Sequence, residues 1–142
     1  EETIDIALGI DTSGSMSDEM LRDILSETKG VMDQYSDFRV HVFCFDTEVH
    51  NPQVFTEHNM EEFMEYEPGG GGGTDFDCCF DWFKEEGIVP KKFVMFTDGY
   101  PWNSWGDENY CDTLFIVHGG GYGGHTPTAP FGITVPYERD EK

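Results

Sequence analysis

Basic residues are scarce in this chain, and their scarcity limits what it can bind. Only 8 Lys and Arg stand against 29 Asp and Glu, which gives a net charge of −21 over 142 residues. Binding to nucleic acid or to an anionic membrane surface is therefore disfavoured, because both need positive charge on the protein. A cation or a basic partner is favoured instead.

Long apolar runs and targeting signals are also missing. The sequence has no stretch of about 18 apolar residues for a membrane span, and no signal-peptide pattern. We therefore expect no membrane partner. The chain lacks an initiating Met and enters its first apolar stretch almost at once, which is typical of a domain cut from a longer protein, as its C-terminal part.

Cysteine is present, but without a functional spacing. Cys44, Cys78, Cys79 and Cys111 form no Cys-x-x-Cys pair and no Cys/His pattern of a structural zinc site. We interpret them mainly as small core residues rather than as a disulfide framework, which indicates a reducing compartment and hence a cytoplasmic protein. Of the scattered histidines, only His118, at the end of an apolar stretch, is expected near a functional site.

The chain does contain enough apolar side chain for one core. Hydrophobic residues make up 37% and aromatic residues 15% of it, which argues against disorder and predicts a single domain over residues 1–142. Residues 4–10 alternate as a strand does, and from Met20 the apolar residues follow the 3.6-residue period of a helix. Between them lies Asp11-Thr12-Ser13-Gly14-Ser15, at the strand-to-helix edge where α/β sheets usually bind ligands.

The polar residues of this pentapeptide suit a hard metal ion. Asp11, Ser13 and Ser15 alternate in a tight turn, so their oxygens can face a common centre. Two later positions can add oxygens: Thr74, after the glycine run 69–73, and Asp98, which ends the apolar run 93–97. As an alternative, Thr74 alone reads as a helix cap. No Lys precedes Thr74, which excludes a Walker A loop.

The remaining patterns predict further strands and helices. Strands are expected at 38–45, 93–97, 113–117 and 133–135, with a hairpin arm at 48–55 that Pro52 restricts to an antiparallel edge. A short helix is expected around Met60, and another carries the apolar stripe of Phe76 to Phe83 and stops at Gly87. After Asp98, no helical period precedes the next strand.

Asp-x-Ser-x-Ser, a Thr after glycines, and a strand-terminal Thr-Asp-Gly together resemble the metal-ion-dependent adhesion site (MIDAS) of von Willebrand factor A (VWA) domains. The resemblance implies an α/β, Rossmann-like three-layer fold with a mostly parallel central sheet and one antiparallel edge strand. The reduced helices of the C-terminal half resemble the abbreviated bacterial and phage versions, which commonly follow a predicted metallopeptidase-like segment. Such a half leaves part of one sheet face bare unless something else covers it.

The same resemblance implies a ligand set and a partner. Ser13, Ser15 and Thr74 would bind Mg²⁺ or Mn²⁺, and less favourably Ca²⁺, through hydroxyls, while Asp11 and Asp98 act directly or through water. A protein partner would then complete the coordination with an Asp or Glu. AAA+ ATPases of the MoxR type are the candidates that the family suggests.

Two further groups of residues are candidates near this site. Asp46, Asp75 and Asp77 are expected either in the second shell of the metal or as solvated acids. Tyr100, Trp102 and Trp105 crowd three aromatics into the loop after Asp98 and are expected to bind the partner. The alternative for these aromatics is that they fold back over a bare sheet face.

Two other functions compete with a metal-dependent interaction module. A Mg²⁺-dependent phosphohydrolase would prefer a second carboxylate at position 13 and a Lys or Arg clamp, but position 13 is Ser and basic residues are absent around the candidate segments. Ser15 also lacks the Gly-x-Ser-x-Gly elbow of a serine hydrolase. A purely structural domain would leave five expected oxygen ligands unexplained. We therefore expect a binding module without catalytic residues.

Overall fold

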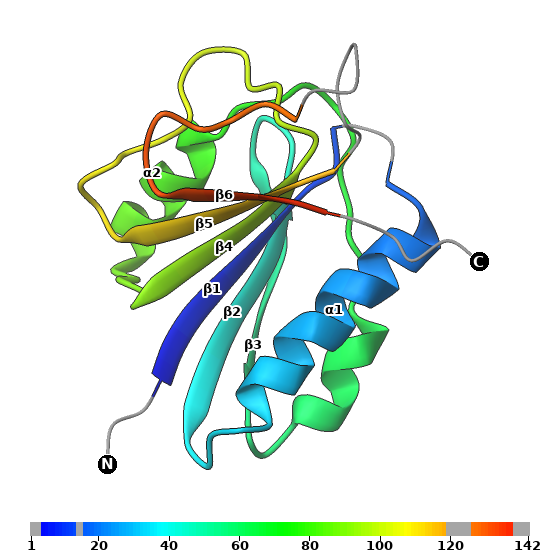
Figure 1. Cartoon of the computed structure of the whole chain (residues 1–142). Coiled ribbons are helices and arrows are strands. Elements are labelled where there is room, and N and C mark those ends of the chain that lie inside the picture. Colours follow the sequence, from blue (N-terminus) through cyan, green and yellow to red (C-terminus); the bar gives the residue numbers. More distant parts are fainter. Residues whose placement is uncertain (1–3, 14–15, 119–125, 138–142) are drawn as a thin grey trace.

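The fold is built on one central sheet with helices on both sides (Figure 1). The computed structural model describes residues 4–13, 16–118 and 126–137. The strands are β1 (Ile4–Asp11), β2 (Phe38–Phe45), β3 (Val49–Thr56), β4 (Lys92–Thr97), β5 (Asp112–Val117) and β6 (Ile133–Pro136). The helices are α1 (Asp18–Met32), the 3-10 helix η1 (Met60–Glu65) and α2 (Asp77–Glu86).

The six strands follow the order β3-β2-β1-β4-β5-β6. All neighbouring pairs are parallel except β2 with β3, which form an antiparallel hairpin. β3 lies at the edge of the sheet, as expected for a strand that contains Pro52, because proline has no N–H to donate to a second neighbouring strand. The predicted Rossmann-like α/β class, with a mostly parallel sheet and one antiparallel edge strand, is confirmed.

One face of the sheet packs against α1 and η1 (Figure 1). Ser17 caps the start of helix α1, since its side chain accepts a hydrogen bond from the Met20 N–H, and the helix buries Ile24 and Leu25. These side chains meet alternate residues of β1 and β2, including Leu8 and Val42. The burial of both helix and strand stripes follows directly from their sequence periods.

The opposite face packs against α2 and is mainly aromatic. Phe43 of β2 and Phe93 of β4 stack with ring centroids 5.9 Å apart, and Phe83 of α2 meets the ring of Phe93 edge-on at 5.0 Å. The predicted stripe of α2 is buried, and Gly87 ends the helix in the left-handed conformation with φ of 70°. The predicted helix and its stop are confirmed.

The C-terminal half has fewer helices, as predicted. Among the residues that the structure describes, no helix lies between β4 and β5 or between β5 and β6. A consequence is that Ile133 and Val135 of β6 are 60% and 41% exposed. No helix of the described chain is long and apolar enough to cross a membrane.

Candidate functional site

The candidate site lies at the carboxyl edge of the sheet. Asp11 ends β1, Asp98 follows β4, and His118 follows β5. Strand order places β1 and β4 side by side and β5 next to β4. The loop residues Ser13 and Thr74 reach the same edge, so segments from four parts of the sequence meet there.

Asp11 is the buried centre of this cluster. Its side chain is 1% exposed, and each of its oxygens accepts from a hydroxyl: Oδ1 from Ser13 Oγ, and Oδ2 from Thr97 Oγ1 at 2.6 Å. The Ser13 backbone N–H also donates to Oδ1, over 2.9 Å. The expected tight turn of Asp11 and Ser13 therefore exists, with both side chains drawn to one point.

Thr74 joins this cluster from a distant segment. Its hydroxyl donates to Ser13 Oγ at 2.5 Å, across 61 residues of sequence. The alternative reading of Thr74 as a helix cap is wrong, because the N-cap residue of α2 is Phe76 and no side chain makes a capping hydrogen bond there. The Thr74 hydroxyl is consequently available to the site.

The electrostatics of the cluster favour an added positive charge. Burial raises the pKa of Asp11, hydrogen bonds from Ser13 and Thr97 act against that rise, and the nearby Asp98 carboxylate adds to it. Asp98 itself is only half buried and accepts from the Tyr100 N–H at 3.3 Å. A cation between these groups would offset both the cost of burying the charged Asp11 carboxylate and its repulsion from Asp98.

Asp46 holds the glycine loop, residues 69–73, by accepting hydrogen bonds from its backbone. Its Oδ2 accepts from the N–H groups of Gly71 and Gly72, each at 3.0 Å. Its Oδ1 accepts from the backbone of Thr47 at 2.6 Å and from His50 Nε2 at 2.9 Å. Burial alone would raise the pKa of Asp46, but the N–H groups of Gly72, Glu48 and Gly71 and the ring of His50 outweigh it and hold the pKa well below its usual range.

The glycines are needed for this approach. Gly71 has a φ of 133°, which other residues rarely adopt, and a side chain at Gly73 would run into the Trp102 ring. The Cys44 thiol also accepts from the Gly69 N–H, at 3.0 Å. Asp46 and Cys44 therefore hold the loop in the course that delivers Thr74 to Ser13.

Asp75 and Asp77, the other second-shell candidates, have their polar contacts elsewhere. Asp75 Oδ1 accepts from the Asp77 N–H at 3.0 Å, while Asp77 Oδ1 accepts from the Ser104 hydroxyl at 2.5 Å. These contacts hold the start of α2 against the loop that follows Asp98. Their observed contacts are therefore structural.

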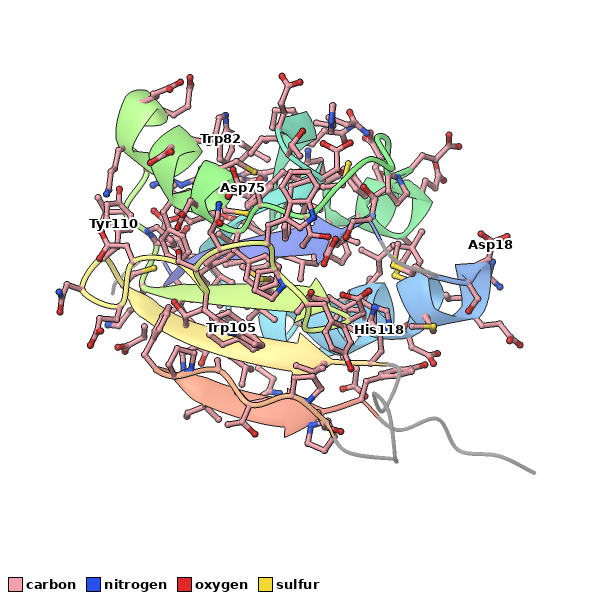
Figure 2. All side chains as sticks on the ribbon, turned by 90° about the horizontal axis from the view of Figure 1, so that it is seen from above. Asp18, Asp75, Trp82, Trp105, Tyr110 and His118 are labelled. Atoms are coloured by element: carbon pink, nitrogen blue, oxygen red, sulfur yellow. The ribbon has the colours of Figure 1, made fainter. Side chains whose placement is uncertain are left out.

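The three aromatics of that loop divide into two groups. Tyr100 and Trp102 are 48% and 66% exposed, and the backbone N–H of Trp102 donates to the Thr74 carbonyl at 3.1 Å. Trp105 instead meets Phe76 and Phe115 edge-on, with ring centroids 5.5 and 5.3 Å away, and lies against the sheet (Figure 2). Trp105 covers the sheet face, which is the alternative expected for these aromatics.

His118 lies at the end of β5 beside the site (Figure 2). It is 3% exposed and packs on Phe96, with ring centroids 4.9 Å apart. Burial lowers its pKa, while the Asp98 charge acts in the opposite direction. Within the described part of the chain, its Nε2 has no hydrogen-bond partner.

The four cysteines lie as small packed residues and form no disulfide bonds. All four are free, with Cys44 and Cys79 buried and Cys78 and Cys111 partly buried. Burial raises the pKa of Cys79 and Cys111, so these thiols are held protonated. The interpretation of the cysteines as packing residues rather than a disulfide framework is confirmed.

Sequence reasoning overlooked Thr97 as a site residue. Its hydroxyl donates to Asp11 and accepts from the Gly99 N–H at 3.0 Å, so it links the ends of β1 and β4. A polar residue at the inward position that ends a buried strand was the available signal. Ser15, the remaining predicted ligand, lies outside the described residues.

The donor set fits a hard divalent cation through hydroxyls rather than through many acids. Among the described residues, no three His, Cys, Asp or Glu side chains gather as a metal-binding group. The oxygens that do converge are one carboxylate and the hydroxyls of Ser13 and Thr74, and such oxygens suit Mg²⁺ or Mn²⁺.

The fold has counterparts among solved structures. The conserved hypothetical protein BatB from Bacteroides thetaiotaomicron superimposes with a TM-score of 0.59 and 16% identity, over 82% of this chain and 67% of that one. An aerotolerance-related membrane protein from Bacteroides fragilis, carrying multiple mutations to serines, gives 0.56 and 14% over 80% and 67%. At these identities the likeness concerns the fold alone.

The family assignment comes from sequence. No curated protein sequence matches this chain. A family model described as VWA-like domain (DUF2201) matches residues 6–136, from the first strand to the last. The chain therefore belongs to this family of VWA-like domains, which generally mediate protein–protein interactions.

Proposed function

We propose that this chain is a divalent-metal-dependent protein-binding module whose metal lies at the carboxyl edge of the sheet. The observation that carries the proposal is the 2.5 Å approach of the Thr74 and Ser13 hydroxyl oxygens, from segments 61 residues apart. Asp11 and Asp98 add negative charge beside them. Mg²⁺ or Mn²⁺ is the cation that such small oxygen ligands favour, ahead of Ca²⁺.

The ion would supply a positive charge that remains open to one more oxygen ligand. In this proposal Ser13, Ser15 and Thr74 hold it through hydroxyls, and Asp11 and Asp98 hold it directly or through water. Two carboxylates roughly cancel a divalent charge, whereas hydroxyls add none, so affinity for a third carboxylate remains. The partner therefore presents an Asp or Glu, and a MoxR-type AAA+ ATPase is the first candidate to test.

The partner would also contact the aromatic rim of the site. Tyr100 and Trp102 are exposed, and the backbone bond from Trp102 to Thr74 keeps this rim beside the hydroxyl cluster. Exposed aromatics of this kind are common binding hot spots. Trp105 is left out of the contact surface, because its ring packs edge-on against the rings of Phe76 and Phe115.

Thermal unfolding with and without Mg²⁺ tests the metal. At free metal about 100 times the dissociation constant, binding adds roughly 2.7 kcal/mol and raises the melting temperature by about 5 to 10 °C. Asp98→Ala should lose this shift, whereas Asp81→Ala, which removes an exposed acid on α2, should keep it. Equal shifts in both variants would place the metal on the diffuse acidic surface.

Capture of the ATPase partner with and without EDTA tests the rest of the proposal. EDTA should abolish capture, and Trp102→Ala should weaken it at least about tenfold while metal affinity stays within about threefold. Trp105→Ala should instead lower the melting temperature. If Trp102→Ala leaves capture unchanged, the aromatic rim is not the contact surface.

We also propose that the chain has no hydrolytic activity and acts in the cytoplasm, where its free thiols would stay reduced. Position 13 offers a hydroxyl, not the second acid of a phosphohydrolase. Phosphomonoesters, nucleotides and peptides with Mg²⁺ or Mn²⁺ should therefore give no turnover. Turnover that disappears in both Asp11→Asn and Asp98→Asn would contradict the binding-module proposal.

A further inference from the structure

A groove separate from the metal site runs between α1 and the last strands of the sheet. It encloses about 450 Å³. Ile24 of α1, Ile116 of β5 and Val135 of β6 form its apolar lining, and Asp23 and Glu27 line the α1 side. We call this feature the β6 groove.

The floor of the β6 groove is a part of the sheet face that no helix of the described residues covers (Figure 1). Ile116 pairs with Val135 and Leu114 with Ile133 across parallel strands, so these four side chains lie on one face. Ile133 and Val135 are 60% and 41% exposed. Among the described residues, α1 and η1 lie mainly over β1 and β2 (Figure 1), and the ring of Tyr137 packs on Phe96 of β4 with centroids 5.4 Å apart.

Such a face is unusual, because strands of parallel sheets normally carry helices on both sides. The exposed Ile133 and Val135 continue the half-buried Leu114 and Ile116 into one apolar surface, and a contiguous apolar surface usually marks an interaction site. A strand added to the edge of β6 would leave this face open, and Pro136 limits the ladder there, since proline donates no hydrogen bond. A helix laid beside α1 would cover the face.

The acidic side chains that line the groove favour a positively charged occupant. Glu27 is exposed and has no hydrogen-bond or ion-pair partner among the described residues, and Asp23 accepts from the Tyr137 hydroxyl at 2.5 Å. None of the described residues that line the groove is Lys or Arg. With a net charge of −21, the chain also disfavours an anionic membrane as the occupant.

We propose that the β6 groove binds an amphipathic helix of a partner protein, with an apolar ridge on Ile116 and Val135 and with Lys or Arg toward Glu27. This binding is independent of the metal proposed at the carboxyl edge of the sheet, because no residue that lines the groove belongs to the Asp11–Ser13–Thr74 cluster. The helix completes the layer that the abbreviated C-terminal half leaves open.

The probe is a fluorescent amphipathic Leu/Lys helix of about 18 residues, long enough for five turns. Its anisotropy is measured at about 0.15 M salt, where diffuse attraction is screened. A Ser/Lys peptide of equal charge and a Leu/Glu peptide of the same apolar ridge serve as controls. The Leu/Lys peptide should bind at least about tenfold more tightly than either control.

Variants locate the binding. Val135→Asp should weaken the Leu/Lys peptide at least about tenfold, and Glu27→Lys at least about threefold. The matched control is Glu86→Lys, another exposed helix glutamate but on α2, which should change affinity by less than about twofold. If Val135→Asp does not fold, Val135→Thr keeps the branched shape and should still weaken binding about threefold.

Several outcomes would overturn the proposal. Equal weakening by Glu27→Lys and Glu86→Lys would show diffuse charge attraction, and unchanged binding in the folded position-135 variant would exclude the groove. Loss of peptide binding in EDTA would indicate that the peptide binds at the metal site rather than in the β6 groove. A wild-type dimer that Val135→Asp converts to a monomer would make a second copy of this chain the occupant.

Discussion

Two aspartates at the carboxyl edge of the sheet have opposite surroundings. Asp11 receives hydroxyl groups from Ser13 and Thr97 on its two oxygens, together with one backbone N–H. Asp46 receives backbone N–H groups on both oxygens, and the ring of His50. Hydroxyls can rotate and turn a lone pair outward, whereas backbone N–H groups can only donate.

This difference makes Asp11 a candidate metal ligand, whereas Asp46 supports the loop that forms the site. The raised pKa of Asp11 reflects a burial that its hydrogen bonds do not fully offset. The lowered pKa of Asp46 reflects a carboxylate satisfied by donors. The same residue type, one strand apart, therefore acts as a candidate ligand in one loop and as the anchor of the glycine loop in the other.

The largest expected effect is on stability, from replacing each aspartate by asparagine without metal. Asp46→Asn places an amide NH₂ against N–H donors that cannot reverse, and should cost about 3 kcal/mol. In Asp11→Asn the new amide NH₂ faces the Thr97 hydroxyl, which can rotate and accept a hydrogen bond from it. This substitution should therefore cost less than about 1 kcal/mol of unfolding free energy. Urea unfolding in EDTA measures both. Similar costs for the two variants would remove the contrast between the loops.

Acid should reduce the contribution of Asp46. Its folded-state pKa lies below the ordinary value of 3.8, so its stabilisation is full above that pH and is lost as pH falls through the folded pKa. The stability difference between wild type and Asp46→Asn should therefore stay constant from about pH 7 to pH 5 and shrink by about 2 kcal/mol toward pH 2. A difference that grows in acid would reverse the assigned sign.

Metal affinity should depend on one hydroxyl of the Asp11 loop and not on its neighbour. Ser13→Ala removes a proposed ligand and should raise the Mg²⁺ dissociation constant about tenfold, or roughly 1.4 kcal/mol. Thr12→Val is the matched control, because the Thr12 hydroxyl donates to the Phe45 carbonyl at 3.1 Å. Calorimetric titration should find the control within about twofold of wild type. Equal losses would indicate a general loosening of the loop.

The smallest expected effect comes from Thr97. Thr97→Val keeps the shape but removes the bond to Asp11 and leaves the Gly99 N–H without its acceptor. We expect a cost of about 1 kcal/mol in unfolding free energy and a dissociation constant for Mg²⁺ raised only about threefold. A loss as large as that of Ser13→Ala would make Thr97 a ligand rather than a support for Asp11.

Local patterns in the sequence were sufficient for the elements and much of the topology. The period change between β1 and α1 located the Asp11 loop, and Pro52 placed β3 at an edge. Gly87 marked the end of α2. These features depend on neighbours close in the chain, such as strand alternation, helix period and backbone freedom, so they can be read without tertiary contacts.

The tertiary structure decided which polar groups face one another. No local pattern distinguishes Asp46 as the anchor of the glycine loop from a solvated acid, or Thr74 as a partner of Ser13 from a helix cap. The same holds for Trp102 and Trp105, which lie in one loop but differ in exposure because only Trp105 meets the rings of the α2 side. Sequence by itself determined the periods and the turns, while long-range packing selected, for each side chain, the donors and rings within its reach.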